Sequence, residues 1–152
     1  MKARDIMVRN VIKVKENQLI EDVLDRFVEY RISGIPVVNE QNELVGYVSD
    51  GDIMKWLGKH DPVIIDYFYF TTVIEDEESL EDKFKRLIRK NVMEVARKNV
   101  ITVDENMEIE KVAEILGRKK IKKVPVVKNK ILTGMISRGD IVRSLKHRFN
   151  ME

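Results

Sequence analysis

Two short stretches of the sequence combine a serine and an aspartate at the same spacing. Ser49 and Asp52 lie in GYVSDGDI, and Ser137 and Asp140 lie in GMISRGDI, so both copies read Gly-apolar-apolar-Ser-x-Gly-Asp-Ile. Each copy predicts a strand that ends at the serine and a helix that follows directly. The first N–H groups of a helix lack partners within it and attract an anion such as a phosphate. An ionised aspartate only accepts hydrogen bonds, which suits the two hydroxyls of a ribose.

The same spacing also has a purely structural explanation. Ser-x-x-Asp is a capping box, in which the serine and the aspartate only satisfy free N–H groups at a helix start. For one copy alone, a cap is therefore the better explanation. Because the whole pattern occurs twice, we favour a shared role in binding a nucleoside phosphate.

Composition narrows the classes of function. The chain has 152 residues, of which 43% are apolar and 36% charged, so we expect one compact domain or two joined halves. The net charge of +2 gives no general attraction to nucleic acid or anionic lipid. The absence of cysteine excludes disulfides, thiolate metal sites and a cysteine nucleophile. We find no signal peptide and no membrane-spanning apolar run, and we expect a soluble cytoplasmic protein.

The motifs belong to a longer internal duplication. Residues 11–38 and 44–57 align with residues 100–127 and 132–145, and about 19 of 42 aligned positions are identical. Short β-branched runs alternate with stretches whose apolar residues recur at helical spacing. Each repeat therefore predicts the order β-α-β-β-α.

The duplication predicts an α/β fold made of two small units. A unit of about 50 residues buries too little surface to be stable alone, so two should pack together. We expect two three-stranded sheets that meet through their helices about a pseudo-two-fold axis, with two equivalent clefts between the halves. The predicted organisation is repeat 1 at residues 1–57, an inserted segment at 58–90 and repeat 2 at 91–152.

The paired repeats, each with an apolar-Pro-Val-Val strand and the serine–aspartate motif, resemble a tandem CBS-domain protein, or Bateman module. Asp5-Ile6-Met7 and Asn91-Val92-Met93 resemble the segment that precedes each repeat in that family, although the second carries three extra residues before its strand. The resemblance implies regulatory binding of AMP, ADP, ATP or S-adenosylmethionine in the clefts. It implies no catalysis and no cofactor apart from this regulatory ligand.

The resemblance also assigns roles to residues. Asp52 and Asp140 would hold ribose hydroxyls, and Ser49 and Ser137 would contact ribose or phosphate oxygens. The remaining assignments concern the adenine pocket: backbone groups at Gly34, Ile35, Lys123 and Val124 would read the base edge, Pro36 and Pro125 would shape the wall, and Thr102 would lie at the floor. Lys13 stands at the position equivalent to Thr102, and Gly51 and Gly139 stand where many family members have a basic residue near the phosphates.

The two motifs differ in charge. Arg138 occupies the position equivalent to Asp50. An arginine beside a helix start favours an anion, so the hypothesis is that the second motif binds phosphate better than the first. The alternative is that both side chains point into water.

The segment from residue 58 to 90 has no counterpart in the duplication. It contains four consecutive aromatic residues, Tyr67 to Phe70, and then a capping box at Ser79 and Asp82 before an amphipathic helical stripe. We expect an inserted strand or irregular segment followed by a helix. The aromatic residues could cover an edge of the repeat pair, or form a lid or a docking surface.

Two other readings stay open. The basic stretch 118–123 favours nucleic-acid binding with strong salt dependence, and its alternative is a solvated helix end. The aromatic insertion favours a protein interaction module without a ligand.

His60 and His147 are expected at the surface rather than in a metal site. The family resemblance implies a homodimer through helix faces around Val23, Phe27 and Leu57, and a signal to an unknown effector protein.

Overall fold

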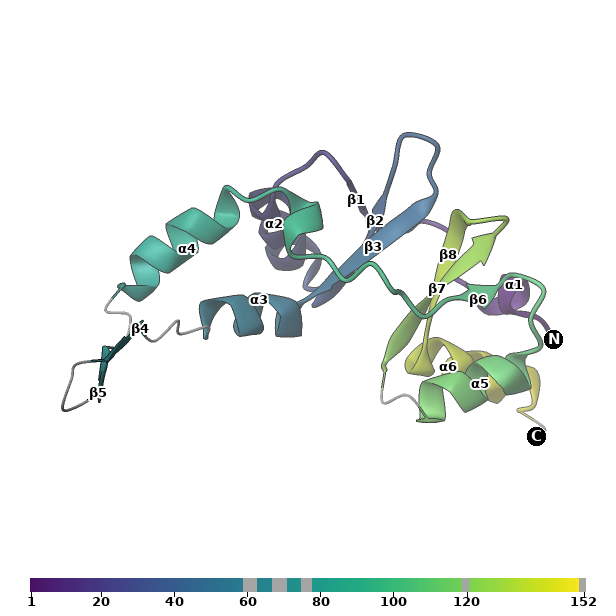
Figure 1. The fold of residues 1–152 in the computed structure, drawn as a ribbon. Helices are drawn as coiled ribbons and strands as arrows, with labels where there is room; N and C mark the ends of the chain where they lie inside the picture. The colour runs from purple at the N-terminus through teal and green to yellow at the C-terminus, as the bar shows by residue number, and fades with distance from the viewer. Residues whose placement is uncertain (59–62, 67–70, 75–77, 119–120, 151–152) are drawn as a thin grey trace.

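The computed structural model describes residues 1–58, 63–66, 71–74, 78–118 and 121–150. Its elements follow the predicted order in both repeats (Figure 1). The first part contains α1 (Ala3–Ile6), β1 (Val14–Lys15), α2 (Ile20–Tyr30), β2 (Gly34–Val38), β3 (Leu44–Ser49) and α3 (Asp50–Leu57). The insertion contains β4 (Val63–Asp66), β5 (Thr71–Ile74) and α4 (Leu80–Ile88). The last part contains η1 (Val92–Glu94), β6 (Val103–Asp104), α5 (Ile109–Arg118), β7 (Lys123–Lys128), β8 (Ile131–Ser137) and α6 (Arg138–Arg148).

Each repeat forms a three-stranded sheet, and the predicted α/β class is confirmed. The strand orders are β1-β2-β3 and β6-β7-β8, with a parallel first pair and an antiparallel second pair in each. In β2, only Val37 and Val38 pair with β1. The half of β2 from Gly34 to Pro36 is therefore an edge on that side, which explains how a proline is accommodated in a middle strand.

The segments that lead into the repeats, residues 1–10 and 90–99, each pack on the other repeat. We call them the lead-in segments. Their isolated bridges come in equivalent pairs: Lys2 with Glu108 and Asn91 with Leu19, then Val8 with Met135 and Arg97 with Tyr47. The predicted pseudo-two-fold symmetry is visible in these pairs.

The same crossing explains the glycine that opens each motif. A Cβ at Gly46 would lie 3.2 Å from the Ala96 side chain and 3.3 Å from the Arg97 carbonyl oxygen, and one at Gly134 would lie 2.6 Å from Met7 Sδ. A larger residue would push the lead-in segment off the strand. Glycine is required here by close approach rather than by a turn.

Two hydrophobic cores result, one in each repeat. Ala3 and Met7 from the first lead-in segment belong to the core of the second repeat. Leu87 from the insertion and Val92 from the second lead-in segment belong to the core of the first repeat. The core of each repeat is therefore completed by residues that precede the other repeat in the sequence.

The two sheets meet at their hairpin ends. Glu43 and Ile131, which are equivalent residues, form an isolated bridge. Beside it, the Leu44 N–H donates to the Lys130 carbonyl oxygen and the Leu132 N–H donates to the Asn42 carbonyl oxygen, both at 3.0 Å. This bridge lies on the pseudo-two-fold axis. We expected the two sheets to meet through their helices, and here they meet through backbone hydrogen bonds between their hairpins. Backbone N–H and carbonyl groups at a sheet edge are free to form such bonds, whereas those within a helix are already paired.

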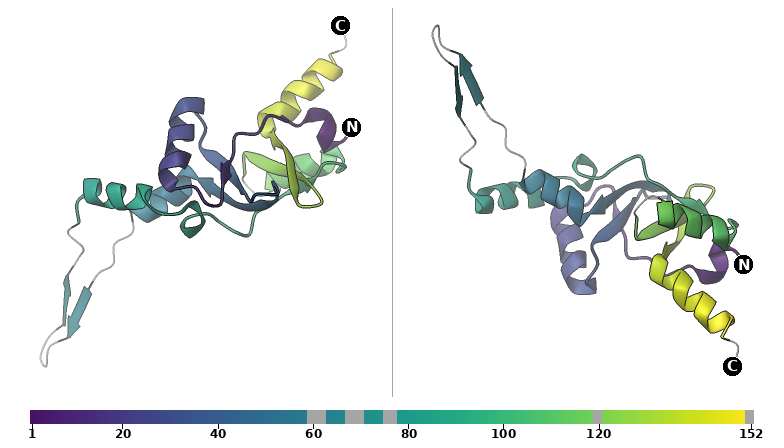
Figure 2. Two further views of the ribbon diagram at one scale, coloured as in Figure 1. Left: turned by 90° about the horizontal axis from the view of Figure 1, so that it is seen from above. Right: turned by 90° about the horizontal axis from the view of Figure 1, so that it is seen from below.

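The insertion divides into a packed helix and a projecting hairpin. The side chain of Leu87 in α4 is fully buried against the first repeat. Arg86 and Lys90 place their cationic groups over the Trp56 ring of α3, at 5.5 and 4.7 Å from the ring centroid. Strands β4 and β5 pair from Val63 with Ile74 to Asp66 with Thr71, and the hairpin extends away from both repeats (Figure 2). The expected helix is present. The aromatic residues 67–70 and His60 lie outside the described residues.

Within the described part of the chain, no helix has the length and apolar character needed to cross a membrane.

Candidate ligand-binding cleft

Both serine–aspartate motifs form helix caps. In α3, the Asp52 N–H donates to Ser49 Oγ at 3.3 Å and the Ser49 N–H donates to Asp52 Oδ2 at 2.8 Å. In α6, the corresponding distances are 3.0 Å from the Asp140 N–H to Ser137 Oγ and 2.9 Å from the Ser137 N–H to Asp140 Oδ2. The capping explanation is therefore correct for both copies. It fixes each carboxylate at a helix start, which is also where a ligand would meet it.

An arginine contacts each of these carboxylates, and the two arginines come from different elements. Arg97, in the second lead-in segment, places Nε 3.4 Å from Asp52 Oδ2, while the Asp52 side chain is only 9% exposed. Arg143 in α6 places a guanidinium nitrogen 2.9 Å from Asp140 Oδ1. A Cβ at Gly139 would lie 2.8 Å from the Arg143 guanidinium, so this glycine leaves room for a basic group one turn later in the helix.

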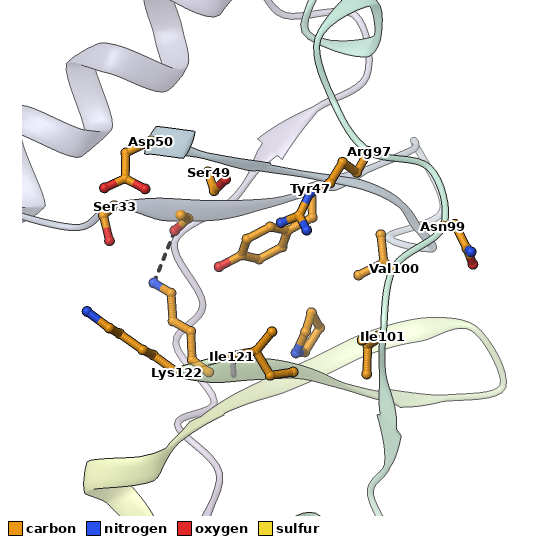
Figure 3. A pocket seen from close by; sticks show the side chains of 13 residues that line it. Ser33, Tyr47, Ser49, Asp50, Arg97, Asn99, Val100, Ile101, Ile121 and Lys122 are labelled. Atoms are coloured by element: carbon orange, nitrogen blue, oxygen red, sulfur yellow. Dashed lines mark hydrogen bonds between the residues drawn. The ribbon is translucent and has the colours of Figure 1, made fainter. Parts of the chain in front are cut away.

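A cavity of about 330 Å³ lies between the repeats (Figure 3). Small-molecule sites have volumes of about 300–1,000 Å³, so one nucleoside-sized ligand fits this range. The cavity is lined from both repeats and the second lead-in segment by Ser33, Gly34, Tyr47, Ser49, Asp50, Arg97, Asn99, Val100, Ile101, Ile121, Lys122, Lys123 and Pro125.

Four of the twelve site residues predicted from the sequence line this cavity: Gly34, Ser49, Lys123 and Pro125. The other eight, which do not line it, are Ile35, Pro36, Asp52, Thr102, Val124, Ser137, Arg138 and Asp140. Ile35 and Val124 have fully buried side chains, which leaves only their backbone groups for a base. Asp52 lies directly behind the lining residues Ser49 and Arg97.

Arg138 has a partner within the fold. Its Nε and one terminal nitrogen donate to the Leu116 carbonyl oxygen at 3.0 and 2.7 Å. This carbonyl belongs to the last turn of α5, where a cation is favourable. In this structure Arg138 therefore caps α5, while both Arg138 and Asp50 are exposed. Its proposed preference for phosphate stays a hypothesis.

Tyr47 and Arg97 are lining residues that the sequence patterns did not single out. The Tyr47 ring lies over Gly34, where a Cβ would come within 2.9 Å of its Cε1. The backbones of Tyr47 and Arg97 exchange two N–H to carbonyl bonds of 2.9 Å, and the Arg97 guanidinium lies 5.8 Å from the Tyr47 ring centroid. Tyr47 follows the motif glycine, which is the only sequence signal. Arg97 lies in the stretch that breaks the duplication.

The cavity is cationic on balance. Among the described residues that line it, Arg97, Lys122 and Lys123 are basic and Asp50 is acidic. Lys123 Nζ crosses between the repeats and donates to the Gly34 carbonyl oxygen at 3.1 Å, drawn as a dashed line in Figure 3. Burial lowers the pKa of Lys123, because its charge is partly removed from water.

The Tyr47 hydroxyl stays protonated. Burial is the main cause that raises the pKa of Tyr47 to about 12, while the Arg97 charge acts in the opposite direction. At neutral pH this hydroxyl can therefore donate or accept a hydrogen bond at the cavity wall.

A duplicated unit with a cleft between its two copies defines a two-repeat architecture. The chain matches the CBS domain over residues 3–59 and again over residues 92–147. The chain therefore belongs to the CBS-domain family and carries a pair of these domains. The insertion between residues 60 and 91 lies outside both matches.

Similar proteins support this assignment. The uncharacterized protein MJ1426 of Methanocaldococcus jannaschii is 32% identical over 95% of this chain and 91% of its own length. A crystal structure of CBSX2 in complex with AMP matches with a TM-score of 0.73 at 23% identity, covering 97% of each chain. The CBS domain pair of MJ0100, in complex with 5'-methylthioadenosine and S-adenosylmethionine, matches with a TM-score of 0.69 at 23% identity, covering 97% of this chain and 98% of that one.

The repeat pair also occurs inside larger proteins. The chain spans only 25% of the inosine-5'-monophosphate dehydrogenase of Aquifex aeolicus, to which it is 28% identical over 96% of this chain. The match concerns the CBS pair and not the whole enzyme.

Proposed function

We propose that this protein is a regulatory, non-catalytic module that binds an adenosine derivative in the cleft between its two CBS repeats. The observation that carries the proposal is the cavity of about 330 Å³, lined from both repeats beside a capped helix start. The complexes of CBSX2 with AMP and of MJ0100 with adenosine-containing ligands support it.

The sheet edge provides groups that can read a base. From Gly34 to Pro36, strand β2 has no partner on the β1 side, and β7 has the same open half because β6 pairs only with Val126 and Val127. A purine edge needs paired donors and acceptors at a fixed spacing, which an open strand supplies. We therefore propose that backbone groups at Gly34 and Lys123 contact the base.

The charge of the cavity favours an anionic ligand. The described lining residues include three basic side chains and one carboxylate. This balance of charge strengthens the binding of a phosphate and weakens the binding of a sulfonium cation. We therefore propose an adenine nucleotide such as AMP, ADP or ATP in preference to S-adenosylmethionine.

We propose that the response reaches another molecule. A ligand that contacts both repeats biases their relative orientation, and only that difference in affinity can shift an equilibrium. We propose that this happens in a homodimer that passes the change to an effector protein.

Thermal unfolding tests the proposal directly. The wild-type protein is heated with AMP, ADP, ATP, S-adenosylmethionine and guanosine, next to Asp52→Asn and Asp140→Asn. A ligand at 100 times its dissociation constant adds about 2.7 kcal/mol, a shift of several degrees at this size. A shift with one adenine nucleotide that an aspartate variant abolishes supports the proposal. A folded protein that no ligand in the panel stabilises contradicts it.

One observation favours a second candidate, a protein interaction module. The hairpin of β4 and β5 extends away from the repeats, as Figures 1 and 2 show, and isolated hairpins have little stability of their own. The nucleic-acid alternative has less support, because Arg118 pairs with Glu114 at 3.1 Å. Lys119 and Lys120 lie outside the described residues.

A further inference from the structure

We propose that Arg97 determines specificity in the cleft. Its guanidinium contacts Asp52, and a ligand with an anionic group draws this guanidinium away. This inference rests on the proposed function, since it requires Asp52 to hold the ribose. It predicts that the first repeat selects nucleotides over uncharged nucleosides.

The oxygen that Arg97 contacts is already crowded. Asp52 Oδ2 accepts the Ser49 N–H at 2.8 Å and the Ser49 hydroxyl at 3.0 Å, and Arg97 Nε lies 3.4 Å away. A carboxylate oxygen has about two lone pairs. A ribose diol that engages both oxygens of Asp52 must therefore displace a donor from Oδ2. Arg97 is the donor that can leave, because the Ser49 contacts belong to the helix cap.

Arg97 is anchored at its backbone and free at its end. Two backbone bonds of 2.9 Å to Tyr47 hold its Cα at the cavity wall, while its side chain is 55% exposed. Its contact with Asp52 is a single long one and not a bidentate ion pair. It therefore contributes little to stability and is easily replaced by a contact with a ligand. The guanidinium can turn about this anchor toward the cavity that it lines together with Lys122 and Lys123.

The exchange has different consequences for two kinds of ligand. An uncharged nucleoside removes the Arg97 contact and offers no anion in return. A nucleotide replaces it with a charge-assisted bond to phosphate, which is stronger than a neutral hydrogen bond. Arg97 therefore opposes nucleosides and favours nucleotides.

The second repeat has no equivalent of this residue. Val8 stands at the position equivalent to Arg97, and it bridges to Met135 as Arg97 bridges to Tyr47. The arginine on Asp140 is Arg143, three residues further along the same helix. Only the aspartate of the first repeat, Asp52, is therefore contacted by an arginine from a lead-in segment, so the proposed selection of nucleotides over nucleosides applies to the first repeat.

The test compares AMP with adenosine by isothermal titration calorimetry on the full chain. The variants are Arg97→Gln and the control Lys98→Gln, which removes the same charge from the next residue, also exposed. In Arg97→Gln we expect adenosine to bind about two- to fivefold more tightly, since an exposed ion pair of this kind has been removed. AMP should bind about tenfold more weakly, since a charged hydrogen bond has been lost. Lys98→Gln should keep the wild-type ratio.

The double variant Arg97→Gln with Asp52→Asn isolates the contact. The readout is the unliganded protein: removal of Arg97 should change the free energy of unfolding of the wild type by more than it changes that of Asp52→Asn, because the ion pair is already lost in the second background. An unchanged ratio of AMP to adenosine affinity in Arg97→Gln overturns the role of Arg97 and leaves the proposed function standing. Binding of neither ligand to the wild-type protein overturns both.

Discussion

Tyr47 and Lys123 shape the cleft from opposite repeats, and each does so at the cost of an unfavourable burial. Tyr47 fits because Gly34 leaves room for its ring. Lys123 occupies the position equivalent to Gly34 and reaches across to its carbonyl oxygen. The two repeats are thus identical in backbone pattern but not in the groups they place between them, which predicts one preferred site rather than two equal ones.

The pKa of Tyr47 predicts a loss of stability at alkaline pH. The value of about 12 in the folded protein exceeds the ordinary value of 10.0, so the folded state favours the protonated ring. This contribution is complete below about pH 10 and is lost as pH rises through about 12. Between these values the wild type should lose about 2 to 3 kcal/mol more than Tyr47→Phe. Urea unfolding of both proteins across this range measures the difference. Parallel curves would contradict the burial of a neutral Tyr47.

The burial of Lys123 predicts a trade between stability and binding. Lys123→Met removes a partly desolvated charge and keeps the volume of the side chain. We expect the free energy of unfolding to rise by up to about 1 kcal/mol, or about 2–4 °C in Tm. Anionic ligands should bind more weakly. Lys122→Met serves as the control, because Lys122 lines the same cavity but is exposed. A Lys123 variant that loses stability would show that the bond to Gly34 outweighs the desolvation.

Sequence reasoning reached only part of this site. Gly34, Ser49, Lys123 and Pro125 could be placed because the family resemblance assigns them to the ligand site. Tyr47 could not, because an aromatic residue on a strand is equally typical of a core. Arg97 could not, because it reaches Asp52 only through the crossing of the lead-in segment, which no local pattern encodes.

At the scale of elements, the helices were the most predictable parts. The apolar stripe after Ser79 predicted α4 correctly, and the repeated motifs predicted α3 and α6 together with their caps. The hairpin of β4 and β5 was not resolved from the sequence, where a single strand or irregular segment was expected. Its β-branched runs fit one buried strand as well as two paired strands.

Helix α4 should be essential to the first repeat although it lies in the insertion. Leu87 is fully buried in that core, while Leu80 on the same helix is 67% exposed. Leu87→Ala should cost about 2–5 kcal/mol, whereas Leu80→Ala should change stability by less than about 0.5 kcal/mol. Chemical denaturation measures both. An equal effect of the two substitutions would show that α4 is not docked as described.

At the scale of the whole molecule, the crossing of the lead-in segments joins the repeats. Removal of residues 1–7 deletes Ala3 and Met7 from the second core, more than 90 residues away in sequence from the strands they pack on. We expect hydrogen exchange to accelerate in β7, β8, α5 and α6, with protection kept in β2, β3 and α2. Truncation that exposed the first repeat instead would contradict the crossed arrangement.

The crossing also has a consequence for the order in which the protein matures on the ribosome. Residues 3–7 are made before the repeat on which they pack, and their binding partners extend to Ile141 in α6. The first repeat likewise waits for Leu87 and Val92. Translation at about 5–20 residues per second therefore leaves the first lead-in segment without its native contacts for several seconds. Within the repeat pair, the segment that is synthesised first is among the last to become native.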